Sequence, residues 1–177
     1  GCILRCNPDG SEFEVFANGL RNCQYFDFDN YGNIFAVDHD ADFQGERERL
    51  VYLPEGSDSG WRMYYQYRNT TLVKAARDDL YNPWLGEKMW LPFHEGQPSH
   101  LLPAIENSWN APAAFSFQPG TALAGAYRDH FLIGGMGNIR AFKMIADGAG
   151  FKRQGDHILI QGLGAQVLTS AFGPDGR

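Results

Sequence analysis

Several features that would assign a function at once are missing from this sequence of 177 residues. It has no block of Lys and Arg, and its formal net charge is -6, so nucleic acid is not an expected partner. No apolar run approaches the ~18 residues that a membrane-spanning helix needs, so we expect no transmembrane segment. Neither a C-x-x-C nor a C-x-x-C-H motif occurs, so the signature of haem attachment is lacking.

Cysteine is scarce, and the three residues Cys2, Cys6 and Cys23 are an odd number. In a strand Cys2 and Cys6 would share a face but lie roughly 13 Å apart, beyond disulfide reach. A bridge between them therefore requires a turn in the backbone. The other interpretation is that all three are buried free thiols. Their number does not decide the redox compartment.

Helical periodicity is also nearly absent, whereas short strands with turn signals recur along the chain. Residues 25–29 alternate between apolar and polar, residues 34–37 are a continuous apolar run, and residues 30–33 (Asn-Tyr-Gly-Asn) between them predict a tight turn. Similar units occur near residues 3–16, 115–120 and 139–153. Repeated strand–turn–strand units predict an all-β fold made of β-propeller blades.

One region lacks the recurring strand–turn–strand pattern. Residues 66–110 are rich in Tyr, Trp, Pro and Asn, and they predict a long irregular or partly helical insertion between strands or blades. Aromatic side chains of the insertion, including Trp109, are candidates for the wall of a pocket. The alternative is that they only bury the insertion against the propeller.

The length of the chain limits the number of blades. Propellers have about 4–8 blades of four strands, with roughly 40–50 residues in each. Residues 1–177 therefore predict one partial propeller domain of roughly three four-stranded blades, part of a larger ring. Three blades would leave strand edges unpaired. We expect the remaining blades to come from the same chain or from a partner chain.

An acidic stretch follows the second strand of the hairpin. Asp38, Asp40 and Asp42 concentrate carboxylate oxygens, which are ligands that Ca²⁺ prefers. The spacing is not that of an EF-hand. Arg47 and Arg49 stand beside neighbouring glutamates, so an alternative is a solvated strand edge of ion pairs.

Several motifs resemble a known family. G-L-R-N-x-Q, F-D-x-x-G-N-I-F-A, D-H-D-A-D and E-R-E-R-L-V-Y are similar to segments of the glucose/sorbosone dehydrogenase-like propellers. The resemblance is closest to the bacterial "membrane-bound dehydrogenase" type, in which a propeller is often joined to a c-type cytochrome domain. It covers most of the chain apart from the insertion.

This resemblance implies a pyrroloquinoline quinone (PQQ)-dependent dehydrogenase-like oxidoreductase. It would oxidise a small-molecule sugar or alcohol and pass electrons to a quinone cofactor or a cytochrome. The expected location is the periplasm, the cell envelope or the extracellular space. The catalytic His of such enzymes belongs to an earlier blade that this sequence does not contain, and His39 is not its counterpart.

The resemblance also implies site residues. Its R-N-x-Q segment binds the quinone, which corresponds to Arg21, Asn22 and Gln24. PQQ carries three carboxylates, and an Arg guanidinium offers a bidentate fork for one of them. A loop after the next strand supplies backbone carbonyls to Ca²⁺, which corresponds approximately to Asp40 and Ala41.

The sequence departs from the PQQ pattern at three cationic positions. Gly134 and Gly135 follow the strand after which a Lys is expected, and residues such as Gln166 and Leu168 replace two arginines. Without these cations a trianionic cofactor is poorly compensated. An alternative function is therefore a non-catalytic propeller, a binding or scaffold subunit of a larger envelope or extracellular complex. Arg21 would then be a structural arginine.

Overall fold

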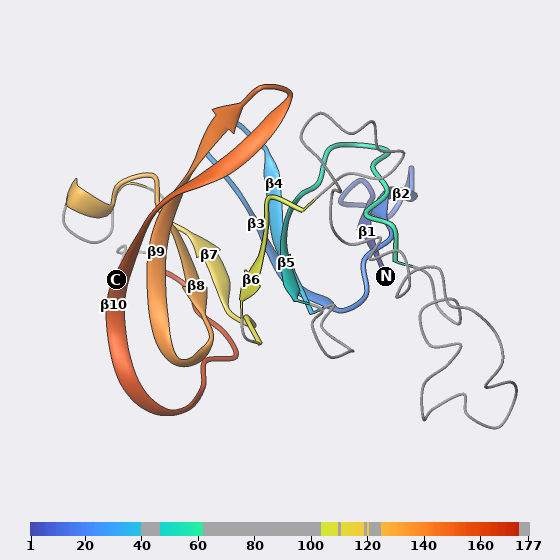
Figure 1. The fold of residues 1–177 in the computed structure, drawn as a ribbon. Helices are drawn as coiled ribbons and strands as arrows, with labels where there is room; N and C mark the ends of the chain where they lie inside the picture. The colour runs from blue at the N-terminus through green and yellow to red at the C-terminus, as the bar shows by residue number, and fades with distance from the viewer. Residues whose placement is uncertain (40–46, 62–103, 110, 119, 121–124, 174–177) are drawn as a thin grey trace, which may run out of the picture. The chain divides into compact units, whose positions relative to one another are not determined.

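The structure is a computed structural model that describes residues 1–39, 47–61, 104–109, 111–118, 120 and 125–173 (Figure 1). Contacts divide the chain into two compact units. The first contains Gly1–Arg21 and Glu55–Ala104, and the second contains Asn22–Pro54 and Ile105–Arg177. The second unit carries most of the described strands.

The first unit contains an antiparallel pair, β1 (Cys2–Arg5) and β2 (Glu14–Asn18). The turn that joins them closes with hydrogen bonds from the Asn7 amide to the Ser11 carbonyl and from the Gly10 amide to the Asn7 carbonyl. The predicted strand–turn–strand unit near residues 3–16 is therefore confirmed.

The exposure of the three cysteines differs from what we expected. Cys2, Cys6 and Cys23 are all free, but Cys2 and Cys6 are exposed and Cys23 is half-buried. The interpretation that all three thiols are buried is thus wrong. In the two-stranded sheet of β1 and β2, only Ile3 of β1 is buried. The alternation of residues along β1 did not indicate which of its faces is exposed.

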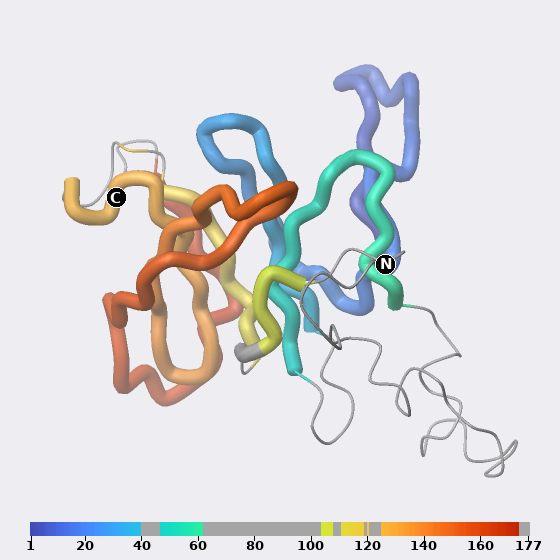
Figure 2. The backbone as a smooth tube through the Cα atoms, turned by 45° about the horizontal axis from the view of Figure 1, so that its top comes forward, coloured from blue at the N-terminus to red at the C-terminus, as the bar shows by residue number. Residues whose placement is uncertain are grey.

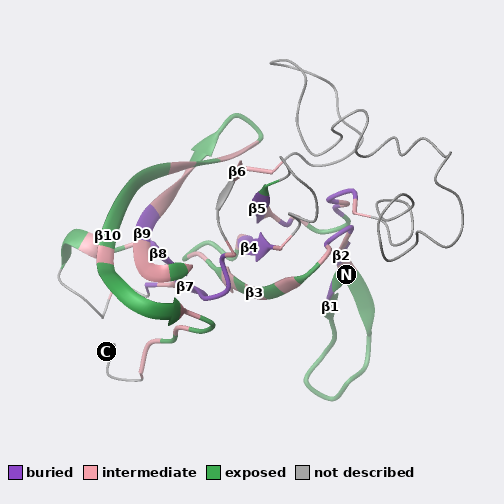
Figure 3. Cartoon of the chain, turned by 60° about the horizontal axis from the view of Figure 1, so that its bottom comes forward, coloured by how far each residue is buried: buried purple, intermediate pink, exposed green. Residues whose placement is uncertain are grey.

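The second unit contains two four-stranded antiparallel sheets, each with its strands in chain order. The strands of the first sheet are β3 (Cys23–Phe28), β4 (Ile34–Asp38), β5 (Glu48–Tyr52) and β6 (Glu106–Trp109). Four strands that pair in sequence order form the meander of a propeller blade. Figure 3 shows β4 and β5 buried, and every residue of β4 is buried.

The second sheet follows the same plan. Its strands are β7 (Phe115–Phe117), β8 (Phe131–Gly134), β9 (Met136–Asp147) and β10 (Gly150–Gln166). A 3₁₀ turn, η1 (Gly125–Tyr127), precedes β8. Figure 2 traces β9 and β10 as one long hairpin at the orange-to-red end of the chain. Three register shifts interrupt their pairing.

The turn between β3 and β4 forms as the sequence predicts. Asp29 Oδ1 accepts hydrogen bonds from the amides of Tyr31 and Asn33, at 2.8 and 2.9 Å. Gly32 has φ of +83°, a conformation that glycine adopts without steric cost. The carboxylate and the glycine together hold the hairpin closed.

The core lies between the two sheets of the second unit. Its buried side chains alternate along the strands, so each sheet turns one apolar face toward the other; they are Phe35, Val37, Leu50, Phe115, Phe131, Ile133 and Phe142. The Phe131 ring stacks on Phe115 with centroids 5.0 Å apart and meets Phe35 edge-on at 5.2 Å. Aromatic pairs in these geometries stabilise beyond the area they bury.

The first strands of the two sheets lie side by side. Asp27 Oδ2 accepts a hydrogen bond from the Phe117 amide at 2.7 Å, and the Asn30 amide donates to Asp129 at 2.8 Å. Adjacent four-stranded meanders with neighbouring first strands are the arrangement of propeller blades. The predicted all-β propeller fold is confirmed. No helix in the described part of the chain is long and apolar enough to cross a membrane.

The predicted insertion, residues 66–110, lies largely within the undescribed residues 62–103. Its last part is described and forms β6, which pairs with β5 through Glu48–Trp109, Arg49–Asn107 and Leu50–Glu106. The insertion therefore falls between two neighbouring strands of one sheet.

Replacing Phe131 with Ala should destabilise the protein strongly. The side chain is 1% exposed, and its removal leaves a cavity at the centre of the aromatic cluster. We expect the free energy of unfolding to fall by about 3–5 kcal/mol, measured by urea denaturation. Tyr31→Ala is the control because that ring is 91% exposed, and it should change stability by less than about 0.5 kcal/mol. Equal effects of the two variants would contradict this core.

Candidate functional site

The candidate residues of the second unit gather at one end of its sheets, which we call the loop edge. It is the end where β3, β5 and β7 begin and where β4, β6 and β8 end. Its described residues include Asn22, Asp38, His39, Glu48, Arg49, Pro112 and Gly134. The ring of His39 donates a hydrogen bond to the Pro112 carbonyl, which joins the two sheets at this edge.

A buried ion pair organises the loop edge. Arg49 Nη2 lies 2.5 Å from Asp38 Oδ2, and the two side chains are 3% and 0% exposed. The other oxygen, Asp38 Oδ1, accepts a hydrogen bond from the Asn22 amide at 2.8 Å. Asp38 therefore fastens the start of β3 and the start of β5 to the end of β4. A buried carboxylate with both oxygens bonded in this way positions the backbone around it.

The Arg-Asn-x-Gln segment crosses the boundary between the units. Arg21 closes the first unit and is half-buried, whereas Asn22 and Gln24 belong to the second unit and are exposed. The Asn22 backbone is held by Asp38, and its carbonyl accepts from the His39 amide at 3.4 Å. The exposed amides of Asn22 and Gln24 thus project from a fixed backbone.

The predicted calcium ligands are described only in part. Asp40, Ala41 and Asp42 lie outside the described residues, so the calcium site stays a prediction. Asp38 is described, and both of its oxygens already accept hydrogen bonds. Across the described ranges, no group of three or more His, Cys, Asp or Glu is placed to hold a metal ion. For Trp109 the structure describes the backbone, which ends β6 opposite Glu48.

The ion pair is the feature of the loop edge that we did not predict. A solvated edge was one of the two interpretations of the E-R-E-R run, but the structure buries Arg49 because β5 lies inside the sheet. A sequence signal exists: Asp38 ends a fully apolar strand, and a charge there needs a buried partner.

Cys23 lies next to this pair. Burial raises the pKa of its thiol to about 12, and the negative charge of Asp38 adds to the shift. The thiol donates a weak hydrogen bond to the Tyr25 carbonyl, with Sγ 3.6 Å from the oxygen. Cys23 is therefore a poor nucleophile.

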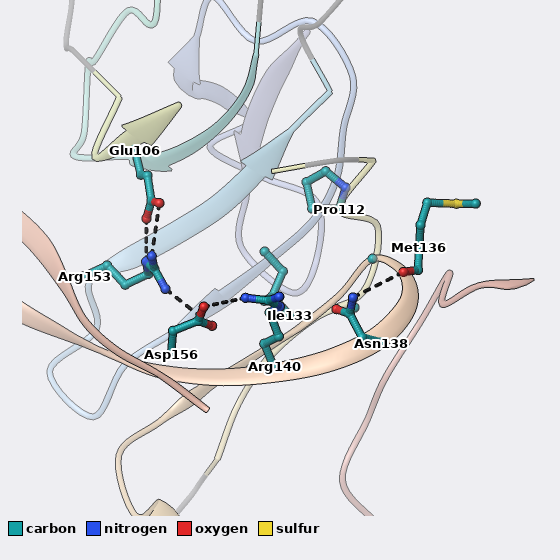
Figure 4. A pocket seen from close by; sticks show the side chains of 10 residues that line it. Glu106, Pro112, Ile133, Met136, Asn138, Arg140, Arg153 and Asp156 are labelled. Carbon is teal, nitrogen blue, oxygen red and sulfur yellow. Dashed lines mark hydrogen bonds and ion pairs between the residues drawn. The ribbon is translucent and has the colours of Figure 1, made fainter. Parts of the chain in front are cut away.

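A cavity of about 400 Å³ opens beside the loop edge, where Pro112 and Gly134 form part of its lining. Its charged side chains are Glu106, Arg140, Arg153 and Asp156 (Figure 4). Neither Arg140 nor Arg153 was a candidate from the sequence, because Asp156 lies 16 positions from Arg140 and Glu106 lies 47 positions from Arg153 along the chain.

Comparisons with known proteins bear on the fold. No protein-family model matches the chain, and no curated protein matches it. Solved structures do. One is a protein of Thermus thermophilus described provisionally as an oxidoreductase (glucose dehydrogenase), with 15% identity and a TM-score of 0.61 over 92% of this chain. The chain has the fold of part of a β-propeller.

Another structure, a glucose dehydrogenase, is 18% identical with a TM-score of 0.58, again over 92% of this chain. The chain spans only 40% and 41% of the length of these two proteins. The match thus covers less than half of each protein, in agreement with the partial propeller that the sequence predicts.

Removing one partner of the buried pair should cost far more stability than removing both. We expect Asp38→Ala to lower the free energy of unfolding by about 3–5 kcal/mol, because it leaves the Arg49 charge buried without its carboxylate. The double variant Asp38→Leu, Arg49→Met should lose less than the sum of the two single variants. Urea denaturation of the wild type, the single variants and the double variant gives the coupling energy, and strictly additive losses would contradict the pair.

The Cys23 thiol should make stability fall as the pH rises. A free thiol has a pKa near ~8.5 in the unfolded chain, whereas the folded value is about 12. Between these values the folded state binds more protons than the unfolded state, so the free energy of unfolding declines with increasing pH. Cys23→Ala should flatten this decline between about pH 8.5 and 10, measured by urea denaturation. An unchanged slope would show that Cys23 does not titrate with a raised pKa.

Proposed function

We propose that this chain is part of a propeller oxidoreductase of the sugar or alcohol dehydrogenase type. The observation that supports this most is the fold match over 92% of the chain with two proteins described as glucose dehydrogenases. The Arg21-Asn22-x-Gln24 segment is the second support, since it is the quinone-binding motif of the family that the sequence resembles. The proposed location is the periplasm, the cell envelope or the extracellular space.

PQQ is the cofactor that this proposal implies. The exposed amides of Asn22 and Gln24 are suited to the oxygens of a quinone, and Arg21 is suited to one carboxylate. A bound PQQ would accept the two electrons of the oxidised substrate. Calcium, if present, would be held by the acidic stretch after Asp38.

The described residues do not meet the full charge of PQQ. Three carboxylates need several cations, and Arg49 at the loop edge is already engaged by Asp38. Gly134 and Gly135 stand where the family has a Lys. Asn22 and Gln24 would therefore serve the polar part of the quinone, and further cations would be needed for the remaining carboxylates. The remainder of the propeller and a c-type cytochrome acceptor are the proposed partners.

A second candidate function is a non-catalytic binding or scaffold propeller. The observation that favours it is the engagement of the loop-edge arginine: Arg49 serves the interior of the sheet. In this case Arg21 and Asn22 would have a structural role and bind no quinone.

Titration of the full-length protein with PQQ and Ca²⁺ separates the two functions. We expect the quinone absorbance to appear on the protein and an artificial dye to be reduced when sugars or alcohols are added. Arg21→Gln should weaken PQQ binding by about 10-fold or more, because a charge-assisted hydrogen bond is lost. Arg5→Gln, an exposed arginine paired with Glu14 and Glu55, is the matched control and should bind normally. If neither absorbance nor turnover appears, the dehydrogenase is rejected and the scaffold is favoured.

A further inference from the structure

The cavity beside the loop edge contains a row of four charges of alternating sign. Glu106 is followed by Arg153, then Asp156, then Arg140 (Figure 4). Arg153 binds both oxygens of Glu106 through Nε and Nη2, and its Nη1 lies 3.5 Å from Asp156 Oδ1. Arg140 Nη1 donates to the other oxygen of Asp156. The row therefore has a negative end at Glu106 and a positive end at Arg140.

The two arginines differ in how many donors they have left. All three guanidinium nitrogens of Arg153 are engaged, since its Nη1 also donates to the Gly155 carbonyl at 3.1 Å. Arg140 uses only Nη1, and in the described part of the chain its Nε and Nη2 groups make no hydrogen bond. Its side chain is 31% exposed. Arg140 therefore presents a partly shielded, fixed guanidinium edge to the cavity.

The neighbours of Arg140 add one amide and an apolar wall. Asn138 lies two positions earlier on β9 and, like Arg140, lines the cavity. Its Nδ2 donates to the Met136 carbonyl at 3.2 Å, which leaves a second N–H on that nitrogen. Pro112, Ile133 and Met136 are the apolar residues of the lining.

We propose that this cavity binds a small aliphatic carboxylate. The planar edge of Arg140 matches the two oxygens of a carboxylate, and the positive end of the row favours a negative group there. Pro112 and Met136 would take the aliphatic part of the ligand. Asp156 holds the guanidinium in position from its other side. The lining contains none of Arg21, Asn22 and Gln24, and a carboxylate ligand there goes beyond the proposed oxidoreductase function.

Calorimetric titration of the full-length protein tests the proposal with two probes of the same shape. We expect 3-methylbutanoate to bind saturably, and 3-methylbutanamide, which lacks the charge, to bind at least about 10-fold more weakly. Equal binding of acid and amide would overturn the carboxylate assignment. Absence of saturable binding by the acid would overturn the site.

Two variants locate the site on the chain. Arg140→Gln should weaken binding of 3-methylbutanoate at least about 10-fold, because the bidentate charged donor is lost. Lys152→Gln is the matched control, since this exposed lysine of β10 pairs with Asp147 at 3.4 Å and is not part of the lining. The control should bind as the wild type does, and circular dichroism checks that both variants fold. Wild-type affinity in Arg140→Gln would overturn the proposal.

Discussion

The buried pair of Asp38 and Arg49 is the constraint on which the loop edge depends. Two charges inside a sheet lose their water, and this cost is offset only when the remaining hydrogen-bonding groups are satisfied. Asp38 meets that condition by bonding to Arg49 on one oxygen and to the Asn22 amide on the other. The same carboxylate that compensates the arginine therefore sets the start of β3. Any ligand that binds Asn22 meets a backbone placed by an interaction in the interior.

Much of the fold follows from local patterns in the sequence. The hairpin of β3 and β4 was predicted because residues 25–29 alternate and because residues 30–33 are typical of a tight turn. In the structure Gly32 has a positive φ, and the Asp29 carboxylate also closes the turn. These signals depend on neighbouring residues in the sequence, so they predict the hairpin whatever the tertiary packing is. The length of the chain predicted a partial ring, and the match with about 40% of the length of two solved structures supports it.

The sequence predicted the site less well, because burial is not a local property. Arg49 stands in a run of alternating charges, which is typical of a solvated edge. It is buried because β5 lies between β4 and β6, and β6 comes from more than fifty residues further along the chain. The partner of Arg140, Asp156 on β10, was hidden for a related reason. Register shifts in the pairing of β9 with β10 change which side chains share a face, so simple alternation fails there.

The arginines of the second unit show how a ligand site can be recognised in such a chain. A guanidinium has five N–H donors in a fixed plane. Whether an arginine can bind an external anion depends on how many of these donors already bond to the protein. Arg153 gives all its nitrogens to Glu106, Asp156 and a carbonyl, and it also lies over the Phe142 ring at 5.7 Å, so it serves the packing of β10. Arg140 is held by one nitrogen only. Binding of an external anion by this unit should therefore follow Arg140, the guanidinium that is positioned by a partner but not saturated by it.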